Sequence, residues 1–160
     1  MNQGSNRAIE GGCLCGRVRY RLAGVPTDVA HCHCRLCRRS TGAPLVTWAT
    51  VAPEALEVLS GDVAWYRSSP AARRGFCPNC GTQLFFAYDA DARATRPDLP
   101  PEAIPEIDVT VASLDDPDLC RPTRNVWAGT RLAFLHGFDR DLPDRPDEGP
   151  RDDAIAPSTD

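Results

Sequence analysis

The sequence lacks the features that would place the chain in a membrane or export it. It contains no run of about 18 apolar residues, so no membrane-spanning helix is predicted. Its first residues, MNQGSNRAIEGG, contain no apolar core, so no secretory signal is predicted. We therefore expect a cytoplasmic protein in a reducing compartment, where its eight cysteines favour metal binding over disulfides.

The sequence also lacks a strongly basic region. The net charge is −4, and residues 139–160 contribute −5 through eight acidic residues and three arginines, which leaves residues 1–138 near +1. Phosphate contacts need clustered Lys or Arg, so nucleic-acid binding is disfavoured. A length of 160 residues fits one domain. We expect a flexible leader over residues 1–10, a folded domain over residues 11–138 and a disordered acidic tail over residues 139–160.

No internal repeat and no strong amphipathic helix is visible, and fifteen prolines with twelve glycines favour short strands and turns. In residues 17–22, Val18, Tyr20 and Leu22 alternate with arginines, which is the period of a half-buried strand. The proline-rich stretch 90–106 predicts an exposed loop. The domain is therefore predicted to be mainly β. Further strands are expected at residues 43–51, 56–59, 63–66, 84–88 and 107–114, with a last element at 126–136.

Two pairs of cysteines predict a closed structural zinc site. Cys77 and Cys80 form a CPNCG knuckle, whose turn lets two sulfurs reach one ion. Cys13 and Cys15 stand two residues apart, so in extended backbone both sulfurs project from the same side. A structural zinc takes four ligands, and the two pairs together supply them. The alternative is a redox pair at Cys77 and Cys80, which is disfavoured because the strand–helix context of such pairs is missing.

The segment HCHCRLCRRSTG, from His31 to residue 42, holds the remaining cysteine cluster. Cys32, Cys34 and Cys37 supply three thiolates, and three protein ligands describe an open zinc site that can bind a substrate atom. The alternative is a second closed site with His31 or His33 as the fourth ligand. His33 would project away from Cys32 and Cys34 in an extended chain, which weakens its case.

An open three-thiolate zinc indicates thiol chemistry. Three thiolates leave the centre at net −1, a modest activator of water that still favours a thiolate ligand. An incoming thiol would lose its proton and lie oriented for attack on an aldehyde, giving a hemithioacetal; the reverse step cleaves carbon–sulfur. The nearby Arg35, Arg38 and Arg39 could balance charge or hold substrate carboxylates, or could be ordinary solvated side chains. The isolated Cys120 is expected to be a partly buried free thiol.

Three motifs in order, CLCG, HCHCRLCRRSTGAP and FCPNCGT, resemble the glutathione-dependent formaldehyde-activating enzyme family, whose domain is shared with a centromere-associated protein. The resemblance runs from about Gly11 to His136. It implies a single domain of small zinc-containing β-sheets of the β-tent type. It also implies a carbon–sulfur lyase like S-(hydroxymethyl)glutathione synthase, with glutathione and formaldehyde as the thiol and the aldehyde. Two Zn²⁺ ions are implied, a structural one at Cys13, Cys15, Cys77 and Cys80 and a catalytic one at Cys32, Cys34 and Cys37.

Two other functions compete with the lyase. A non-catalytic, zinc-stabilised binding module would match the centromere-associated relative, although the near-neutral core argues against tight nucleic-acid binding. A thiol redox protein would use Cys120 with a neighbouring cysteine and would form a reversible disulfide.

Overall fold

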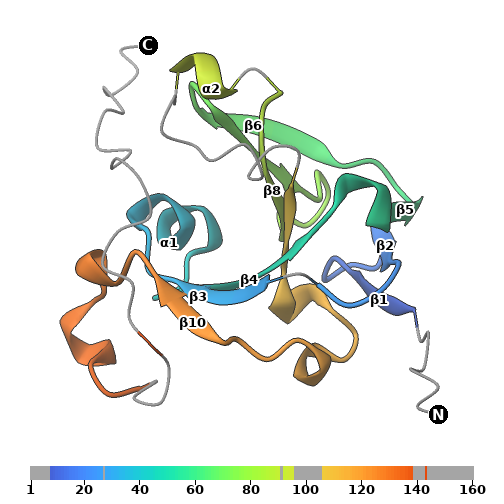
Figure 1. The fold of residues 1–160 in the computed structure, drawn as a ribbon. Coiled ribbons are helices and arrows are strands. Elements are labelled where there is room, and N and C mark those ends of the chain that lie inside the picture. The colour runs from blue at the N-terminus through green and yellow to red at the C-terminus, as the bar shows by residue number, and fades with distance from the viewer. Residues whose placement is uncertain (1–7, 27, 91, 96–105, 139–142, 144–160) are drawn as a thin grey trace.

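Two β-sheets carry the fold in this computed structural model, which describes residues 8–26, 28–90, 92–95, 106–138 and 143 (Figure 1). One sheet has three strands in the order β1-β2-β5, and the other has seven in the order β10-β3-β4-β9-β8-β7-β6. Neighbouring strands are antiparallel except for β10, which runs parallel to β3. The mainly β, single-domain architecture expected from the sequence is confirmed. In chain order the strands are β1 (Ile9–Gly12), β2 (Arg19–Leu22), β3 (Asp28–Cys32), β4 (Val46–Val51), β5 (Leu56–Ser60), β6 (Ala64–Ser69), β7 (Ala72–Phe76), β8 (Gln83–Tyr88), β9 (Ile107–Thr110) and β10 (Arg124–Val126).

Short helices connect the strands. The helix α1 (Arg35–Thr41) follows β3 and contacts β4, and it ends at Gly42, whose φ of 65° is the left-handed conformation that glycine adopts without strain. This helix was not predicted, because seven residues give too little periodicity to detect. In the described part of the chain, the remaining helical elements are α2 (Ala92–Thr95) and the single 3₁₀ turns η1 (Pro53–Ala55), η3 (Val111–Ser113), η4 (Pro117–Leu119), η5 (Ala128–Thr130) and η6 (Ala133–Leu135).

The main core lies between the small sheet and one face of the large sheet. Val18, Tyr20 and Leu22 are each at most 1% exposed, which confirms the alternating pattern expected for that strand. They pack with large-sheet residues such as Val109 and Phe85. The Tyr20 and Phe85 rings meet edge to face with centroids 5.2 Å apart. A second apolar cluster lies on the opposite face of the large sheet, and it includes Trp48 and the central cysteines.

Several boundaries differ from the sequence-based expectation. Ile9 and Glu10, predicted to belong to a leader over residues 1–10, pair with β2 as part of β1, and residues 1–7 lie outside the described part. The loop predicted at residues 90–106 contains α2, while residues 96–105 lie outside the described part. The strand predicted at 107–114 ends at Thr110 in a 3₁₀ turn, and the element at 126–136 is mostly 3₁₀ turns.

Two further expectations concern the ends of the chain and the membrane. The acidic tail predicted at residues 139–160 lies outside the described residues except for Pro143. Within the described residues, none of the helices has the length and apolar character needed to cross a membrane.

Candidate metal centres

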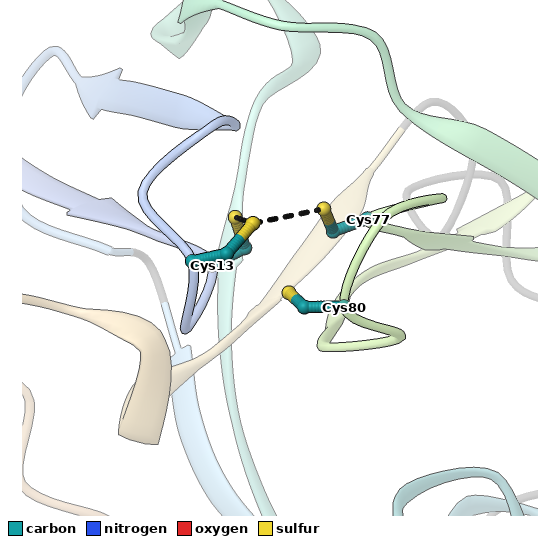
Figure 2. A group of neighbouring side chains, drawn as sticks. Cys13, Cys77 and Cys80 are labelled. Atoms are coloured by element: carbon teal, nitrogen blue, oxygen red, sulfur yellow. Dashed lines mark hydrogen bonds between the residues drawn. The ribbon is translucent and has the colours of Figure 1, made fainter.

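Four cysteines from two turns that are distant in sequence lie close together, and Figure 2 labels Cys13, Cys77 and Cys80 of this cluster. The Sγ atoms of Cys13, Cys15, Cys77 and Cys80 all lie within 4.8 Å of one another. Cys13 and Cys15 belong to the turn between β1 and β2, while Cys77 and Cys80 belong to the turn between β7 and β8. The cluster therefore ties the small sheet to the large one. The sequence predicted this grouping.

The local geometry of the first pair differs from the prediction. Cys13 and Cys15 are not in extended backbone but in a tight turn, closed by a hydrogen bond from the Gly16 N–H to the Cys13 carbonyl (3.0 Å). The CPNC turn is similar, because the Gly81 N–H donates to the Cys77 carbonyl (2.8 Å). Gly16 and Gly81 both have φ of 75°, which lets each chain leave its turn without side-chain strain. Both cysteine pairs thus lie on knuckles of the same kind.

Hydrogen-bond donors surround these sulfurs. The Val18 N–H donates to Cys13 Sγ (3.2 Å), and the side-chain amide of Asn79 donates to Cys15 Sγ (3.3 Å). The Thr82 hydroxyl lies 3.2 Å from Cys80 Sγ, and this contact lowers the pKa of the Cys80 thiol to about 5. Donors at sulfur stabilise thiolates over thiols.

The cluster has the spacing that a tetrahedral thiolate site needs. Four sulfurs at about 2.3 Å from one zinc ion would lie about 3.8 Å apart. The observed separations are 3.5 Å between Cys13 and Cys15 and 3.8 Å between Cys15 and Cys77. All eight cysteines lie in the described residues, and none forms a disulfide. The donor set and its spacing therefore fit a metal ion.

The three central cysteines occupy the junction of β3 and α1. Cys32 is the last residue of β3, Cys34 is the N-cap of α1, and Cys37 lies inside the helix. Cys32 and Cys37 are buried and Cys34 is half-buried. They pack beside Trp48 and Val126 on the face of the large sheet that is turned away from the main core.

The three thiols interact electrostatically. Hydrogen bonds with the Cys32 and Cys37 thiols lower the pKa of Cys34 to about 2. Hydrogen bonds with Cys34 and Cys37 raise the pKa of Cys32 well above its usual range.

Both neighbouring histidines have polar partners on the other face of the sheet. His31 Nδ1 lies 2.9 Å from the Thr47 hydroxyl, and the fully buried His33 has Nε2 2.9 Å from the Asn125 side-chain oxygen. Asn125 pairs with His31 across β10 and β3, so its side chain lies on the face opposite Cys32. This arrangement agrees with the expectation that His33 projects away from Cys32 and Cys34.

Cys32, Cys34 and Cys37 are called the trio from here on. The arginines near the trio are not all placed as expected. Arg35 and Arg39 are exposed, whereas the Arg38 guanidinium donates to the Thr130 carbonyl (3.0 Å). The cation that touches the trio is Arg74 of β7, which sequence reasoning missed. Its Nη2 donates to Cys37 Sγ at 3.5 Å. The sequence offers no signal for this contact, because 37 residues separate the pair.

Cys120 lies apart from both clusters. It is 2% exposed in the main core, and burial raises its pKa. This placement agrees with the expected free thiol, although the side chain is more fully buried than predicted.

Three comparisons show which known proteins this chain is similar to. A model of the glutathione-dependent formaldehyde-activating enzyme family matches residues 8–130. An uncharacterized lyase of Schizosaccharomyces pombe is 38% identical over 80 residues, which span 49% of this chain and 57% of that protein's length. A crystal structure of a Rhodobacter sphaeroides protein is 26% identical with a TM-score of 0.50, and the match covers 71% of this chain and 96% of that one. The family match spans more than half of the chain and contains both cysteine clusters, so the chain belongs to the glutathione-dependent formaldehyde-activating enzyme family.

Proposed function

We propose that this protein is a zinc-dependent, carbon–sulfur lyase-like enzyme that forms or cleaves an adduct between an aldehyde and a thiol such as glutathione. The observation that carries the proposal is the presence of two cysteine clusters with different surroundings. The four-cysteine cluster already has four thiolate donors, whereas the trio has three and includes the half-buried Cys34. We assign a structural zinc to the first cluster and a catalytic zinc to the second.

The two histidines support an open site at the trio. Ring nitrogens of His31 and His33 contact Thr47 and Asn125 on the far face of the sheet from Cys32. This favours an open site over a closed one with a histidine ligand. Zinc at such a site would supply a position at which a thiol loses its proton at neutral pH.

The chemistry assigned to this site is addition to a carbonyl. The sulfur of the bound thiol attacks the aldehyde carbon, a carbon–sulfur bond forms, and the carbonyl oxygen takes up the proton that the thiol released. The reverse step breaks the same bond and returns the aldehyde and the thiol. The chain's own contribution is to place Cys32, Cys34 and Cys37 at the junction of β3 and α1, beside Trp48 and Phe86, whose ring centroids are 6.1 Å apart.

The test is hemithioacetal exchange, measured by NMR with glutathione and formaldehyde. We expect the wild-type protein to accelerate exchange and Cys34→Ser to lose the acceleration by at least about 100-fold, as when a group that acts in the transition state is removed. Cys120→Ala is the matched control, since it removes a buried cysteine outside both clusters. Equal exchange rates for wild type and Cys34→Ser would refute the catalytic role.

The same protein would be cytoplasmic and would take small-molecule partners. The family description names glutathione and formaldehyde, and the relative from S. pombe is named a lyase. If other thiols or aldehydes exchange faster than this pair under the same conditions, the lyase chemistry stands and the assigned substrates change.

A further inference from the structure

Among the described residues, Arg74 is a buried cation without a carboxylate partner. Its side chain is 4% exposed, in the middle of β7. In the part of the chain that the structure describes, the ion pairs include none for Arg74. A buried charge is costly unless a group of opposite charge or several hydrogen bonds compensate it. The groups that contact the Arg74 guanidinium therefore indicate which negative charge it compensates.

Both ends of the guanidinium fork lead to one residue of the trio. Nη2 donates directly to Cys37 Sγ at 3.5 Å. Nη1 donates to the Ser40 hydroxyl at 3.2 Å, and that hydroxyl donates in turn to the Cys37 carbonyl at 3.0 Å. The roles are consistent, because Ser40 uses its hydrogen toward Cys37 and its lone pair toward Arg74. Arg74 thus holds Cys37 through both the sulfur and the backbone.

The sheet places Arg74 on the same face as the trio. Arg74 pairs with Phe86 across β7 and β8, and its guanidinium carbon lies 5.0 Å from the centre of that ring. This cation–π contact holds the guanidinium over the ring, and its two donors contact Ser40 and Cys37 of α1. Lysine, with a single ammonium on a flexible stem, could not make both contacts in this way.

We propose that Arg74 is the positioning residue of the three-cysteine site, where it holds the sulfur of Cys37 and supplies the positive charge that offsets the trio's thiolates. The inference rests on the proposed function, because it takes the trio to be a metal site. Three thiolates with one Zn²⁺ carry net −1, and one buried guanidinium brings the centre to neutrality. Of the three arginines nearest in sequence, Arg35 and Arg39 are exposed, and the Arg38 guanidinium donates to the Thr130 carbonyl.

The two clusters differ in how thiolate charge is compensated. At the four-cysteine cluster, neutral donors such as the Val18 N–H and the Asn79 amide contact the sulfurs, and Cys15 is exposed to water. At the trio, Cys32 and Cys37 are buried, so water compensates less and a full charge is needed. Removal of the Arg74 charge should therefore weaken metal binding at the trio and leave the four-cysteine cluster unchanged.

The experiment is titration of the metal-free protein with Co²⁺, followed by the thiolate-to-cobalt absorption, with Zn²⁺ competition for affinity. Arg74→Met removes the charge and keeps an unbranched stem against Phe86, while Arg74→Lys keeps the charge and loses the fork. Arg73→Met is the matched control, because the neighbouring Arg73 is exposed and its guanidinium lies over Trp65, 4.7 Å from the ring centre. Circular dichroism confirms that each variant is folded.

We expect wild type and Arg73→Met to bind two equivalents of metal with the same affinities. Arg74→Met should bind the second equivalent at least about 10-fold more weakly, as when a residue that orients a metal ligand is removed. Arg74→Lys should lie between them, and the first equivalent should be unchanged in every variant. Partial rescue by lysine separates a charge effect from a general packing defect.

Two results would overturn the inference, and they are distinguishable. Wild-type affinity for the second equivalent in Arg74→Met would overturn the role of Arg74 while leaving the proposed function intact. A wild-type protein that binds a single equivalent would remove the metal site at the trio, and with it both proposals. If Arg74→Met does not fold, Arg74→Lys decides, because full wild-type affinity in that variant would show that the fork does not position Cys37.

Discussion

The two faces of the seven-stranded sheet use cysteine in different ways. One face packs against the small sheet, and its core includes Cys13 and Cys77 of the four-cysteine cluster with fully buried residues such as Tyr20 and Leu22. The other face carries the trio beside the buried cation Arg74. Sulfur on the first face joins two sheets, whereas sulfur on the second is left half-accessible at Cys34. The two cysteine clusters therefore differ in their surroundings as well as in their number of sulfurs, and the proposed function assigns a structural role to the first and a reactive role to the second.

The largest expected effect comes from removing one sulfur of the four-cysteine cluster. This cluster lies on the face of the large sheet that packs against the small sheet, called the structural face below. Cys77→Ser should lower the free energy of unfolding by more than about 4 kcal/mol, because metal binding at a structural site contributes directly to folding. Denaturant unfolding measures it. Cys120→Ala, a buried cysteine of the same core outside the cluster, should cost about 1 kcal/mol. Similar losses for the two variants would show that the cluster has no special structural role.

The corresponding change on the other face should separate activity from stability. Cys34 is half-buried at the start of α1, so Cys34→Ser leaves no large cavity. We expect a stability loss of about 1–2 kcal/mol in the same denaturation experiment, less than half of that for Cys77→Ser. A loss as large as that of Cys77→Ser would place both clusters in the same structural class.

Close packing on the structural face gives a third test. A Cβ at Gly11 would lie 2.5 Å from the Tyr20 hydroxyl and 2.6 Å from the Ser113 carbonyl oxygen, and backbone cannot move away easily. Gly11→Ala should therefore cost about 2–3 kcal/mol by overpacking. The contrasting variant is Gly42→Ala at the end of α1, where a Cβ meets nothing within 4 Å and the φ of 65° alone costs about 1 kcal/mol. Thermal melts of the two variants check the order.

The smallest expected effect is a pH dependence of the free energy of unfolding, caused by Asp108 on the same face of the large sheet as the trio. Burial raises the pKa of Asp108 to about 6, although the Thr50 hydroxyl donates to it at 2.6 Å. The folded state therefore holds this proton more tightly than the unfolded state. The resulting stability is fully present below about pH 4 and is lost as the pH rises through about 6.

Asp108→Asn should remove this loss. We expect the variant to be more stable than wild type by about 1 kcal/mol at pH 8, with no difference at pH 4. The expected gain in stability is smaller than the free energy that the whole pKa shift corresponds to, because the Asp108 side chain is partly exposed. Unfolding curves at the two pH values test it, and a gain of equal size at both would point to lost repulsion or packing in place of proton linkage.

The sequence predicts more of the structural face than of the trio's face. Ligand counting paired Cys13 and Cys15 with Cys77 and Cys80, because a closed site needs four donors and each short motif offers two. Alternation identified the strand that buries Tyr20. Motif spacing and hydrophobic alternation are local features, so they can be read from the sequence without knowledge of the tertiary structure.

What the sequence does not predict depends on contacts between distant elements. Arg74 is one of two adjacent arginines with no pattern to separate them, and only the pairing of β7 with β8 turns it toward α1 while Arg73 is exposed. The helix α1 is too short for a periodic signal, and its polar residues resemble a loop. The turn at Cys13 was missed because spacing alone does not distinguish extended from turned backbone.

The central claim is that the chain holds two metal centres of different kinds. Zinc content per chain, measured together with X-ray absorption on the purified protein, tests it most directly. The account predicts two zinc ions, one with four sulfur ligands and one with three sulfurs and a lighter atom. A single zinc per chain, or two zincs each with four protein ligands, would contradict it.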